Sequence, residues 1–300
     1  MNVGYIGLGR MGGGMVQNLL KEVKPLFIHD AYPEAAARFD GSGATVCKSP
    51  AEIAANCTLI FLCLPFAPAV RETLFGENGI AGAVQSGTTI VDMTTLYRSD
   101  ALDIAKEARD KGFMYWDCPV SGMPVRAENA TLTIMFGGTA DAFAEVKPYL
   151  DLMGNAVTHC GPLGSGQAMK AINNILYNIN IAGLAEVLPL AVKVGLDPML
   201  VAEIVTSGSS RSFASEYYIP KVLEGDFSKD FPMEAAYKDI VNVQEMAKEV
   251  GASMPVTDAM VGSYDAAMEM GYGSEPKSAM LHVYEKALGA YFRKPGFEED

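Results

Sequence analysis

The stretch Gly7-Leu8-Gly9-Arg10-Met11-Gly12 decides the fold that we expect for this chain. Its spacing is Gly-x-Gly-x-x-Gly, and it joins an apolar run, Asn2–Leu8, to a segment with helical periodicity, Met11–Lys21. In such a loop the first glycine permits a tight turn, the second lets a pyrophosphate approach the backbone, and the third allows close helix–strand packing. The helix N-terminus offers free N–H groups and a partial positive charge to phosphate. The stretch therefore predicts a dinucleotide-binding loop, with cofactor-binding residues Gly7, Gly9, Arg10, Met11 and Gly12.

An acidic residue follows the next apolar run at the distance that such a loop requires. Asp30 lies 18 positions after Gly12 and directly after Leu26–His29. A carboxylate there accepts hydrogen bonds from the adenosine ribose hydroxyls and repels a 2′-phosphate, so NAD is expected in preference to NADP. The next arginine is Arg38. The alternatives are that Asp30 caps the helix after Pro33 and that the glycine-rich turn binds nothing.

The first half of the chain alternates apolar runs with amphipathic segments. We expect further buried strands at Leu26–His29, Leu59–Leu64, Thr89–Met93, Met114–Asp117 and Thr131–Phe136. Helical periodicity marks Met11–Lys21, Ala67–Phe75 and Ser99–Lys111. This alternation predicts an α/β Rossmann fold, with a doubly wound, mainly parallel sheet covered by helices on both faces.

The pattern changes after about Gly161, because no strand pattern recurs. The helix-like runs there are Ala168–Val194, Asp197–Ser207, Met233–Val250, Pro255–Met270 and Ala279–Phe292. We therefore expect a dinucleotide-binding domain over residues 1–162 and an all-α domain over residues 163–300, which starts with a long interdomain helix.

Composition and charge exclude several other classes of protein. The chain has 300 residues, 49% of them hydrophobic, and a net charge of −13, which disfavours a nucleic-acid partner. The five cysteines show no Cys-x-x-Cys spacing and the three histidines have no metal-type neighbours, so free thiols and no metal site are expected. No secretory signal and no free-standing apolar stretch of about 18 residues is visible, so we expect a cytoplasmic protein without a membrane span.

Four segments in order resemble the β-hydroxyacid dehydrogenase family, which includes enzymes of the 3-hydroxyisobutyrate dehydrogenase and tartronate semialdehyde reductase type. The first is the glycine loop with Met15 and Asn18-Leu19. The other segments are Asp117-Cys118-Pro119-Val120-Ser121-Gly122 with Thr131–Gly138, then Gly161–Asn174, and finally Lys238-Asp239. The resemblance covers nearly the whole chain, and its two middle motifs are far more specific than the glycine loop. It implies a Rossmann domain, then a helical domain that binds substrate and forms homodimers or homotetramers.

The resemblance also implies roles for single residues. Lys170 is identified as the catalytic lysine and Asn174 as its partner. Ser121 and Gly122 would hold the carboxylate of a small substrate, and Lys238 would reach the active site from the helical domain. Three further residues would line the cofactor, with the last of them near the nicotinamide: Leu64, Pro65 and Thr95.

The spacing of these residues fits the chemistry. Lys170 and Asn174 are four apart on a predicted helix, so they share one face, and Asn178 continues the polar stripe. Hydride transfer from an alcohol carbon leaves a proton on oxygen, which a general base must take. A lysine in a partly dry site beside a positively charged nicotinamide would give up its own proton readily and could serve as that base. The alternative is a solvated edge or a hydrogen-bonded seam between helices.

One loop departs from the family pattern. Where the family has glycines after Ser121-Gly122, this chain has Met123, Pro124 and Val125, followed by Arg126. Pro124 has no N–H and restricts Met123 to extended geometry, whereas Arg126 can grip an anion with two hydrogen bonds. We therefore place Met123 and Arg126 among the substrate-binding residues and expect a hydroxy acid or semialdehyde other than 3-hydroxyisobutyrate. The alternative is that Met123 packs outward and Arg126 meets Glu128 or solvent.

Three other functions share parts of these motifs. An imine reductase has the same architecture but typically lacks the lysine, so Lys170 argues against it. A 6-phosphogluconate dehydrogenase needs a much longer helical domain. A non-catalytic NAD-binding interaction module of this family would usually lose the residues that Lys170 and Asn174 represent. We therefore expect an oxidoreductase that transfers hydride between NAD(H) and a small hydroxy acid, with Lys170 as general acid and base.

Overall fold

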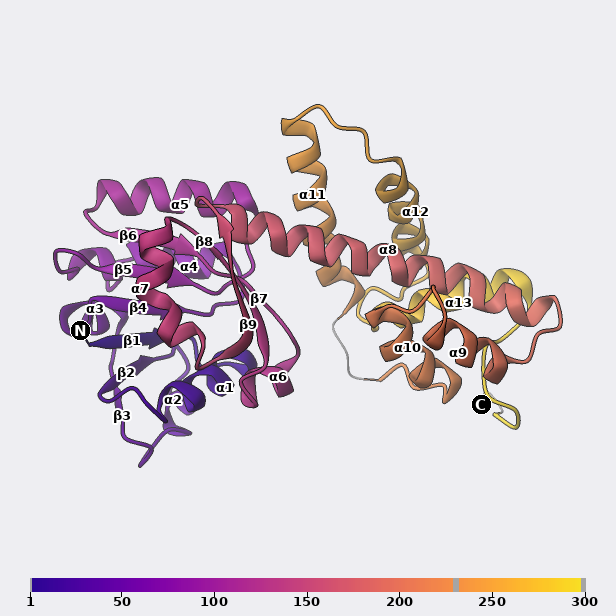
Figure 1. The fold of residues 1–300 in the computed structure, drawn as a ribbon, viewed down its shortest axis with the longest axis horizontal. Coiled ribbons are helices and arrows are strands. Elements are labelled where there is room, and N and C mark those ends of the chain that lie inside the picture. The colour runs from indigo at the N-terminus through magenta and orange to yellow at the C-terminus, as the bar shows by residue number, and fades with distance from the viewer. Residues whose placement is uncertain (1, 229–231, 298–300) are drawn as a thin grey trace. The chain divides into compact units, whose positions relative to one another are not determined.

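The first structural unit is built on one mixed sheet. In the computed structural model, which describes residues 2–228 and 232–297, the chain forms two compact units, Met1–Lys170 and Ala171–Asp300 (Figure 1). The strand order in the first unit is β3 (Ala44–Val46), β2 (Leu26–His29), β1 (Val3–Ile6), β4 (Leu59–Leu62), β5 (Thr89–Asp92), β6 (Met114–Asp117), β8 (Leu132–Gly137) and β7 (Val120–Ser121), and β9 (Gly154–Gly161) pairs with β8. The first six of these run parallel, whereas β8 is antiparallel to β6 and β7 and parallel to β9.

Both faces of the central strands are buried, because successive side chains of a strand point to opposite faces. In β4, Leu59 and Phe61 belong to one apolar cluster, and Ile60 and Leu62 belong to the other. The first cluster includes side chains of α1 (Arg10–Leu19), α6 (Pro124–Glu128) and α7 (Ala140–Leu150). The second includes side chains of α3 (Pro50–Asn56), α4 (Ala67–Phe75) and α5 (Arg98–Asp110). The predicted fold class, a doubly wound and mainly parallel sheet, is confirmed.

Most predicted elements of this unit are present within one or two residues of their predicted bounds, and β2, β6 and α4 match them. Three strands, several short helices and the 11-residue helix α7 were not predicted. β3 is short and lies at the sheet edge, and of β9 only Gly154 is buried, so neither strand carries an apolar run. The segment after Gly122, described from the sequence as a loop, contains the helix α6, with Pro124 as its first residue. Proline suits that position because the first turn of a helix needs no N–H donors.

The second unit contains helices and, among its described residues, no strand longer than an isolated bridge between Pro232 and Pro276. The helix α8 (Ser165–Lys193) begins in the first unit and continues into the second. The other elements are α9 (Pro198–Ser207), α10 (Phe213–Leu223), the 3₁₀ helix η2 (Met233–Ala236), α11 (Tyr237–Glu249), α12 (Pro255–Glu269), the 3₁₀ helix η3 (Lys277–Met280) and α13 (Leu281–Leu288). The predicted helix Ala279–Phe292 is too long, because Gly289 adopts a left-handed conformation (φ 59°) and ends α13.

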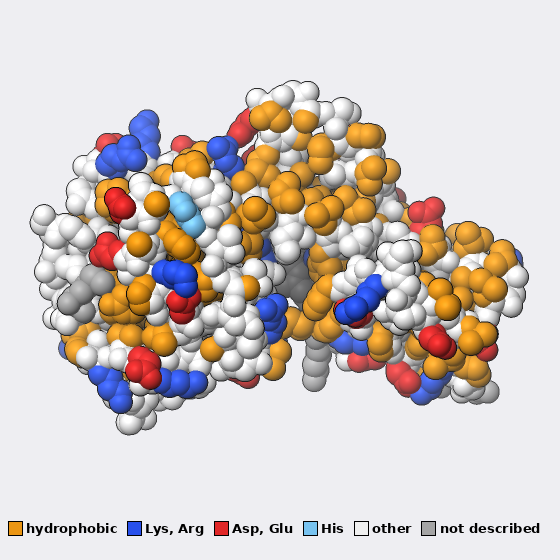
Figure 2. Space-filling view, in the orientation of Figure 1, with side chains coloured by type: hydrophobic (Ala, Val, Ile, Leu, Met, Phe, Trp, Pro, Cys, Tyr) orange, Lys and Arg blue, Asp and Glu red, His pale blue; other side chains and the backbone are white. Residues whose placement is uncertain are grey.

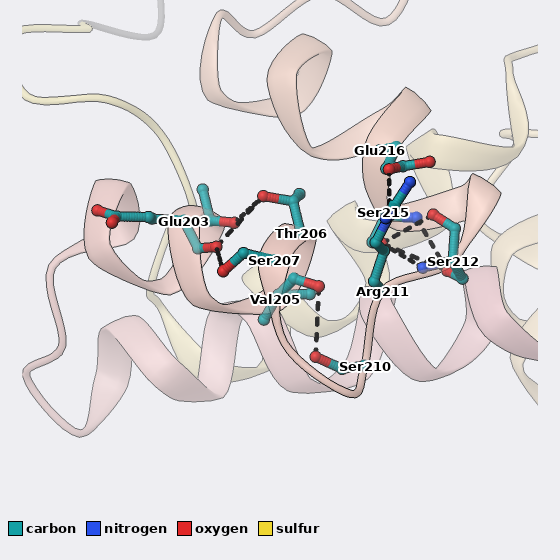
Figure 3. Close-up of polar contacts among 10 residues, drawn as sticks. Glu203, Val205, Thr206, Ser207, Ser210, Arg211, Ser212, Ser215 and Glu216 are labelled. Atoms are coloured by element: carbon teal, nitrogen blue, oxygen red, sulfur yellow. Dashed lines mark hydrogen bonds and ion pairs between the residues drawn. The ribbon is translucent and has the colours of Figure 1, made fainter.

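The helix α10 was missed, although its start carries a local signal. The Ser212 side chain accepts a hydrogen bond from the Ser215 N–H, and the Ser215 side chain accepts one from the Ser212 N–H (Figure 3). This reciprocal pairing is a capping box, in which serine replaces the more usual Glu or Gln. The preceding helix, α9, ends with the Thr206 and Ser207 hydroxyls donating to main-chain carbonyls one turn back. Serine-rich sequence between the two helices thus sets both helix ends.

The long helix α8 contains a longer apolar stretch than was expected from the sequence. It contains an 18-residue window with a mean hydropathy of 1.6, which by length and composition is enough to cross a membrane, whereas no such segment was expected. A core helix passes the same test, and one side of α8 contributes to the main apolar cluster of the second unit through Ala171, Ile175, Ala182, Ala185 and Leu188. The other side leaves Ile172, Leu176 and Leu190 exposed.

Candidate active site

The glycine loop between β1 and α1 has the geometry of a phosphate cradle. Gly7 has φ +98°, and a Cβ atom on it would overlap the Cys63 carbonyl, while a Cβ atom on Gly12 would overlap the Gly7 carbonyl. Gly9 instead faces open space, because a Cβ atom there would meet no other atom within 4 Å. It is the N-cap of α1 and makes no side-chain capping bond to the first turn. These residues therefore fit a bound pyrophosphate, which would approach at Gly9, Arg10 and Met11.

Asp30 lies at the end of β2 and is bonded to the same loop. Its Oδ2 accepts a hydrogen bond from the Leu8 N–H (2.6 Å) and its Oδ1 accepts one from the Tyr32 N–H (2.8 Å). Each carboxylate oxygen can accept a second bond, so the side chain keeps capacity for ribose hydroxyls. Arg38 lies closer to the loop than its sequence position indicates, because its guanidinium donates to the Leu8 carbonyl. Arg38 and Arg10 line one surface pocket with Gly9, Gly13 and Gln17 of the loop and α1.

The loops after β4 and β5 are joined by hydrogen bonds. The Leu64 N–H donates to Thr94 Oγ1 (3.0 Å), and the Thr94 N–H donates to Asp92 Oδ1 (2.9 Å). Tyr115 Oη donates to the other Asp92 oxygen (2.7 Å). Burial raises the pKa of Asp92 to about 6, although these hydrogen bonds lower it. Two of the predicted cofactor-lining residues, Leu64 and Thr95, are half-buried, and the third, Pro65, is exposed.

A second buried carboxylate, Asp117 at the end of β6, holds the beginning of α8. Its Oδ1 accepts from the Gly164 N–H (2.6 Å) and its Oδ2 from the Gln167 N–H (2.7 Å). An anion at a helix N-terminus is favourable because the free N–H groups there carry a partial positive charge. Burial raises the pKa of Asp117 to about 6, against the effect of these backbone bonds. A Cβ atom on Gly137 or Gly166 would collide with the carboxylate, so glycine is required at both positions.

The side chain of Gln167 fixes α8 to the loop after β5. Its Nε2 donates to the Thr94 carbonyl (2.7 Å), and its Oε1 accepts from the Leu96 N–H (3.0 Å). Gln167 is fully buried. Lys170 follows three residues later, so it lies on the same face of the helix, half-buried. The sequence singled out Lys170 as a candidate but did not reveal the contacts of Gln167 and Asp117, although both residues lie inside the quoted motifs.

The predicted carboxylate-binding residues lie in and after β7. Ser121 and Gly122 are half-buried. Gly122 has φ +146°, and a Cβ atom on it would overlap the Leu132 side chain. Met123 is extended (φ −86°, ψ 169°), as Pro124 predicts, and it is the N-cap of α6. The guanidinium of Arg126 turns back to donate to the Thr131 carbonyl and to Thr133 Oγ1 (3.5 Å). These bonds join Arg126 to Thr131 and Thr133 and not to Glu128, and its role in substrate binding stays a prediction.

In the second unit, a polar stripe runs along α8. Asn174 Nδ2 donates to Asp239 Oδ2 (3.0 Å), which brings together two of the quoted family motifs. Lys238 precedes Asp239 in α11 and is half-buried. One turn further along α8, Asn178 Oδ1 accepts from Lys277 Nζ (2.7 Å). The predicted stripe is thus hydrogen-bonded to neighbouring elements, and Lys277 is a partner that the sequence did not reveal.

Together, the fold and these residues define a class: a dinucleotide-binding oxidoreductase with a Rossmann unit and a helical unit. A family model described as the NAD binding domain of 6-phosphogluconate dehydrogenase matches residues 2–161. A second, described as NAD-binding of NADP-dependent 3-hydroxyisobutyrate dehydrogenase, matches residues 164–284. The chain belongs to the β-hydroxyacid dehydrogenase family, NAD(P)-dependent enzymes that act on a CH–OH group.

Individual relatives cover nearly all of the chain. A 2-(hydroxymethyl)glutarate dehydrogenase of Eubacterium barkeri is 38% identical over 96% of this chain and 96% of its own. The human mitochondrial 3-hydroxyisobutyrate dehydrogenase is 38% identical over 83% of this chain and 73% of its own. The structure is similar to that of 3-hydroxyisobutyrate dehydrogenase from Mycobacterium tuberculosis with L-serine, with a TM-score of 0.84 and 27% identity over 94% of this chain and 98% of that one.

The Asp117 contacts predict the effect of a near-isosteric substitution. Asp117→Asn should lower the free energy of unfolding by about 1–3 kcal/mol, because an amide nitrogen cannot accept one of the two buried N–H bonds. It should also lower kcat, since the start of α8 is no longer fixed ahead of Lys170, while NADH affinity changes little. Urea unfolding, steady-state kinetics and NADH titration measure these effects. Asp110→Asn, at an exposed position, is the control. Wild-type stability and kcat in Asp117→Asn would contradict the role of this carboxylate.

Proposed function

We propose that this chain catalyses the reversible NAD(H)-dependent oxidation of a small hydroxy acid, with Lys170 as general acid and base. The observation that carries the proposal is the attachment of α8 to the carboxyl ends of the strands. Asp117 and Gln167 fix the first turn of the helix beside the loop after β5, and the glycine loop follows β1 at the same edge of the sheet. Ligands of open α/β sheets bind at that edge. Lys170 comes three residues after Gln167 on α8, the helix that begins at this edge.

The chemistry that this arrangement supports is a paired loss of hydride and proton. The bound nicotinamide cofactor supplies the hydride acceptor or donor. During oxidation the alcohol C–H bond breaks with its electron pair, the O–H proton passes to Lys170 Nζ, and a C=O bond forms. During reduction Lys170 returns the proton to the oxygen. Asn174 orients the lysine or the substrate hydroxyl from the same face of α8.

The substrate carboxylate is assigned to Ser121, Gly122 and Met123. Main-chain N–H groups in a turn bind anions well. Gly122 has a positive φ and no side chain that would hinder the approach of a carboxylate. On the family resemblance alone, we assign Lys238 to the same substrate. Because Pro124 removes one N–H group at this turn, we propose that the preferred substrate is a hydroxy acid or semialdehyde other than 3-hydroxyisobutyrate, with a different chain or a second polar group.

Replacement of the proposed catalyst gives a direct test. Lys170→Met should remove most turnover, by about 10²–10⁴-fold in kcat, and leave NADH binding nearly intact, because general acid–base catalysis typically contributes that much. Rates are measured with a panel of small hydroxy acids and semialdehydes. Lys193→Met, at the far end of the same helix, is the control. A loss below about tenfold in correctly folded Lys170→Met would reject Lys170 as the catalyst.

The position of Asp30 predicts a preference for NAD over NADP. A 2′-phosphate would approach a carboxylate that is already held against the loop by Leu8 and Tyr32. We expect kcat/KM to be higher with NADH than with NADPH. Asp30→Ala should reduce the difference between the two kcat/KM values, mainly because NADH binds more weakly. Asp40→Ala, at an exposed position, serves as control. A wild-type enzyme with the higher kcat/KM for NADPH would show that Asp30 does not select the cofactor and would point to Arg38.

The helical unit is proposed to form a homodimer or homotetramer. Hydrophobic side chains are spread over the visible face of this unit (Figure 2). Its exposed large hydrophobic residues include Ile172, Leu176, Leu190, Met199, Leu200 and Ile204 of α8 and α9. Such a set is unusual on a surface that remains in water. Leu188 of α8 and Met260 of α12, by contrast, are buried in the core of the unit.

Light scattering tests the assembly. The wild-type mass should be two or four times the 32.0 kDa of the chain at micromolar concentration. Leu176→Glu combined with Leu200→Glu should shift it toward the single chain, because two charges would be buried in an apolar contact. Met114→Glu places the same charge at an exposed apolar position of the first unit and should have no effect. A wild-type mass of one chain would overturn the proposal.

A further inference from the structure

A buried polar side chain on α1 holds the short helix α6. Asn18 is only 2% exposed, and its Nδ2 donates to the carbonyls of Ala127 (2.8 Å) and Glu128 (3.2 Å), the last two residues of α6. It also donates to the Gly14 carbonyl one turn earlier in α1 (3.1 Å), and Oδ1 accepts from Lys21 Nζ (2.7 Å). The last carbonyls of a helix have no N–H partner within that helix. Asn18 therefore caps the C-terminus of α6 from a neighbouring helix.

The backbones of the two helices touch one turn before this contact. A Cβ atom on Gly14 would lie 2.8 Å from the Glu128 nitrogen and 2.9 Å from the Ala127 carbonyl carbon, which is too close for any side chain. Gly14 and Asn18 are four residues apart, so they present the same face of α1 to α6. The position of α6 on α1 is thus set by close backbone contact and by the bonds of one amide.

The helix α6 is too short to hold its own position. It has five residues, whereas an isolated helix needs about 12–15 residues to be even marginally stable in water. Its place therefore depends on bonds to its neighbours. Arg126 attaches it to Thr131 and Thr133, at the start of β8, and Asn18 attaches it to α1.

The two helices begin at the two candidate binding sites of the first unit. The N-cap of α1 is Gly9, where the glycine loop would receive the pyrophosphate. The N-cap of α6 is Met123, which follows Ser121 and Gly122 in the turn to which the substrate carboxylate is assigned. Five residues of helix span only about 7–8 Å, so a shift of α6 on α1 would pass directly to that turn.

We propose that Asn18 is a positioning residue that fixes the carboxylate-binding turn, residues 121–123, to the helix that carries the pyrophosphate loop. This role rests on the proposed function and extends it, because Asn18 acts through α6 and not on a ligand. Loss of its bonds should weaken the hold on the substrate carboxylate and raise KM. Hydride transfer and NADH binding should change little, since the glycine loop and the Asp117 contacts of α8 are untouched.

A near-isosteric substitution tests the role by kinetics. Asn18→Asp keeps the side-chain shape and the bond from Lys21, but a carboxylate cannot donate to the Ala127 and Glu128 carbonyls. The substrates are the best hydroxy acid of the panel and its methyl ester, which lacks the negative charge. In the wild type kcat/KM should be higher for the acid. Asn18→Asp should lower the acid-to-ester ratio by about fivefold or more, through KM rather than kcat.

Two control variants separate this role from the general effect of a lost bond. Asn56→Asp loses a bond of the same kind, from Nδ2 to the Glu52 carbonyl one turn earlier (2.7 Å), within α3. Lys21→Met removes the other partner of Asn18 and leaves its bonds to α6. Both variants should keep the wild-type ratio. A merely structural role for Asn18 would lower stability and leave the ratio unchanged in Asn18→Asp as well.

A milder variant covers the case in which Asn18→Asp does not fold. Ala127→Gly leaves α1 intact and loosens α6, because glycine has more backbone freedom than alanine. It should also lower the acid-to-ester ratio several-fold. A wild-type ratio in folded Asn18→Asp, or in Ala127→Gly where Asn18→Asp does not fold, overturns the positioning role and leaves the hydride-transfer function in place.

A binding measurement separates the positioning role from the reaction. Isobutyrate and isobutyramide have the same shape, carry no hydroxyl to oxidise, and differ in charge. With NAD present, isobutyrate should raise the melting temperature of the full-length wild-type protein more than isobutyramide does, and Asn18→Asp should remove most of that difference. Equal shifts in the wild type, or an undiminished difference in folded Asn18→Asp, overturn the role. A difference that Asn18→Asp removes, without turnover of any acid by either cofactor, supports the role and instead overturns the proposed reaction.

Discussion

The buried carboxylate of Asp117 is the constraint on which the arrangement of the first unit and its link to α8 depends. Removal of this charge from water is costly, and two backbone N–H groups at the start of α8 offset the cost. The Asp117 carboxylate lies so close to Gly137 and Gly166 that a Cβ atom at either position would collide with it. One electrostatic requirement therefore accounts for the glycines of two separate motifs, and it determines where the helix with Lys170 and Asn174 begins.

The sequence predicted those parts of the fold that are buried on both faces, since only these produce apolar runs. The strands β1, β2, β4, β5 and β6 were found for this reason, and the glycine loop was recognised by its spacing. The partly exposed β9 and the five-residue α6 left no such pattern. In α10 the signal was present, as the Ser212–Ser215 capping box, but it used an uncommon residue in the third helical position.

The candidate site residues divide in a similar way. Candidates in local motifs, such as Asp30, Lys170 and Asn174, are visible in the sequence because their spacing follows a recognisable pattern. The contacts that restrain them are not, because they join positions far apart: Arg38 with Leu8, Gln167 with Thr94, and Lys277 with Asn178. Such pairings arise from tertiary packing. A charged residue like Lys277 reads as a surface side chain until burial is known.

The continuity of α8 makes the chain sensitive to length at one place. Gln167, Lys170 and Asn174 are oriented by the phase of a single helix that passes from one unit into the other. One residue inserted between Gln167 and Asn174 would turn everything after it by about 100° around the helix axis. Hybrid enzymes that exchange helical units between relatives therefore need a crossover point that conserves residue count through this segment, whereas the loops at the ends of the helix leave more freedom.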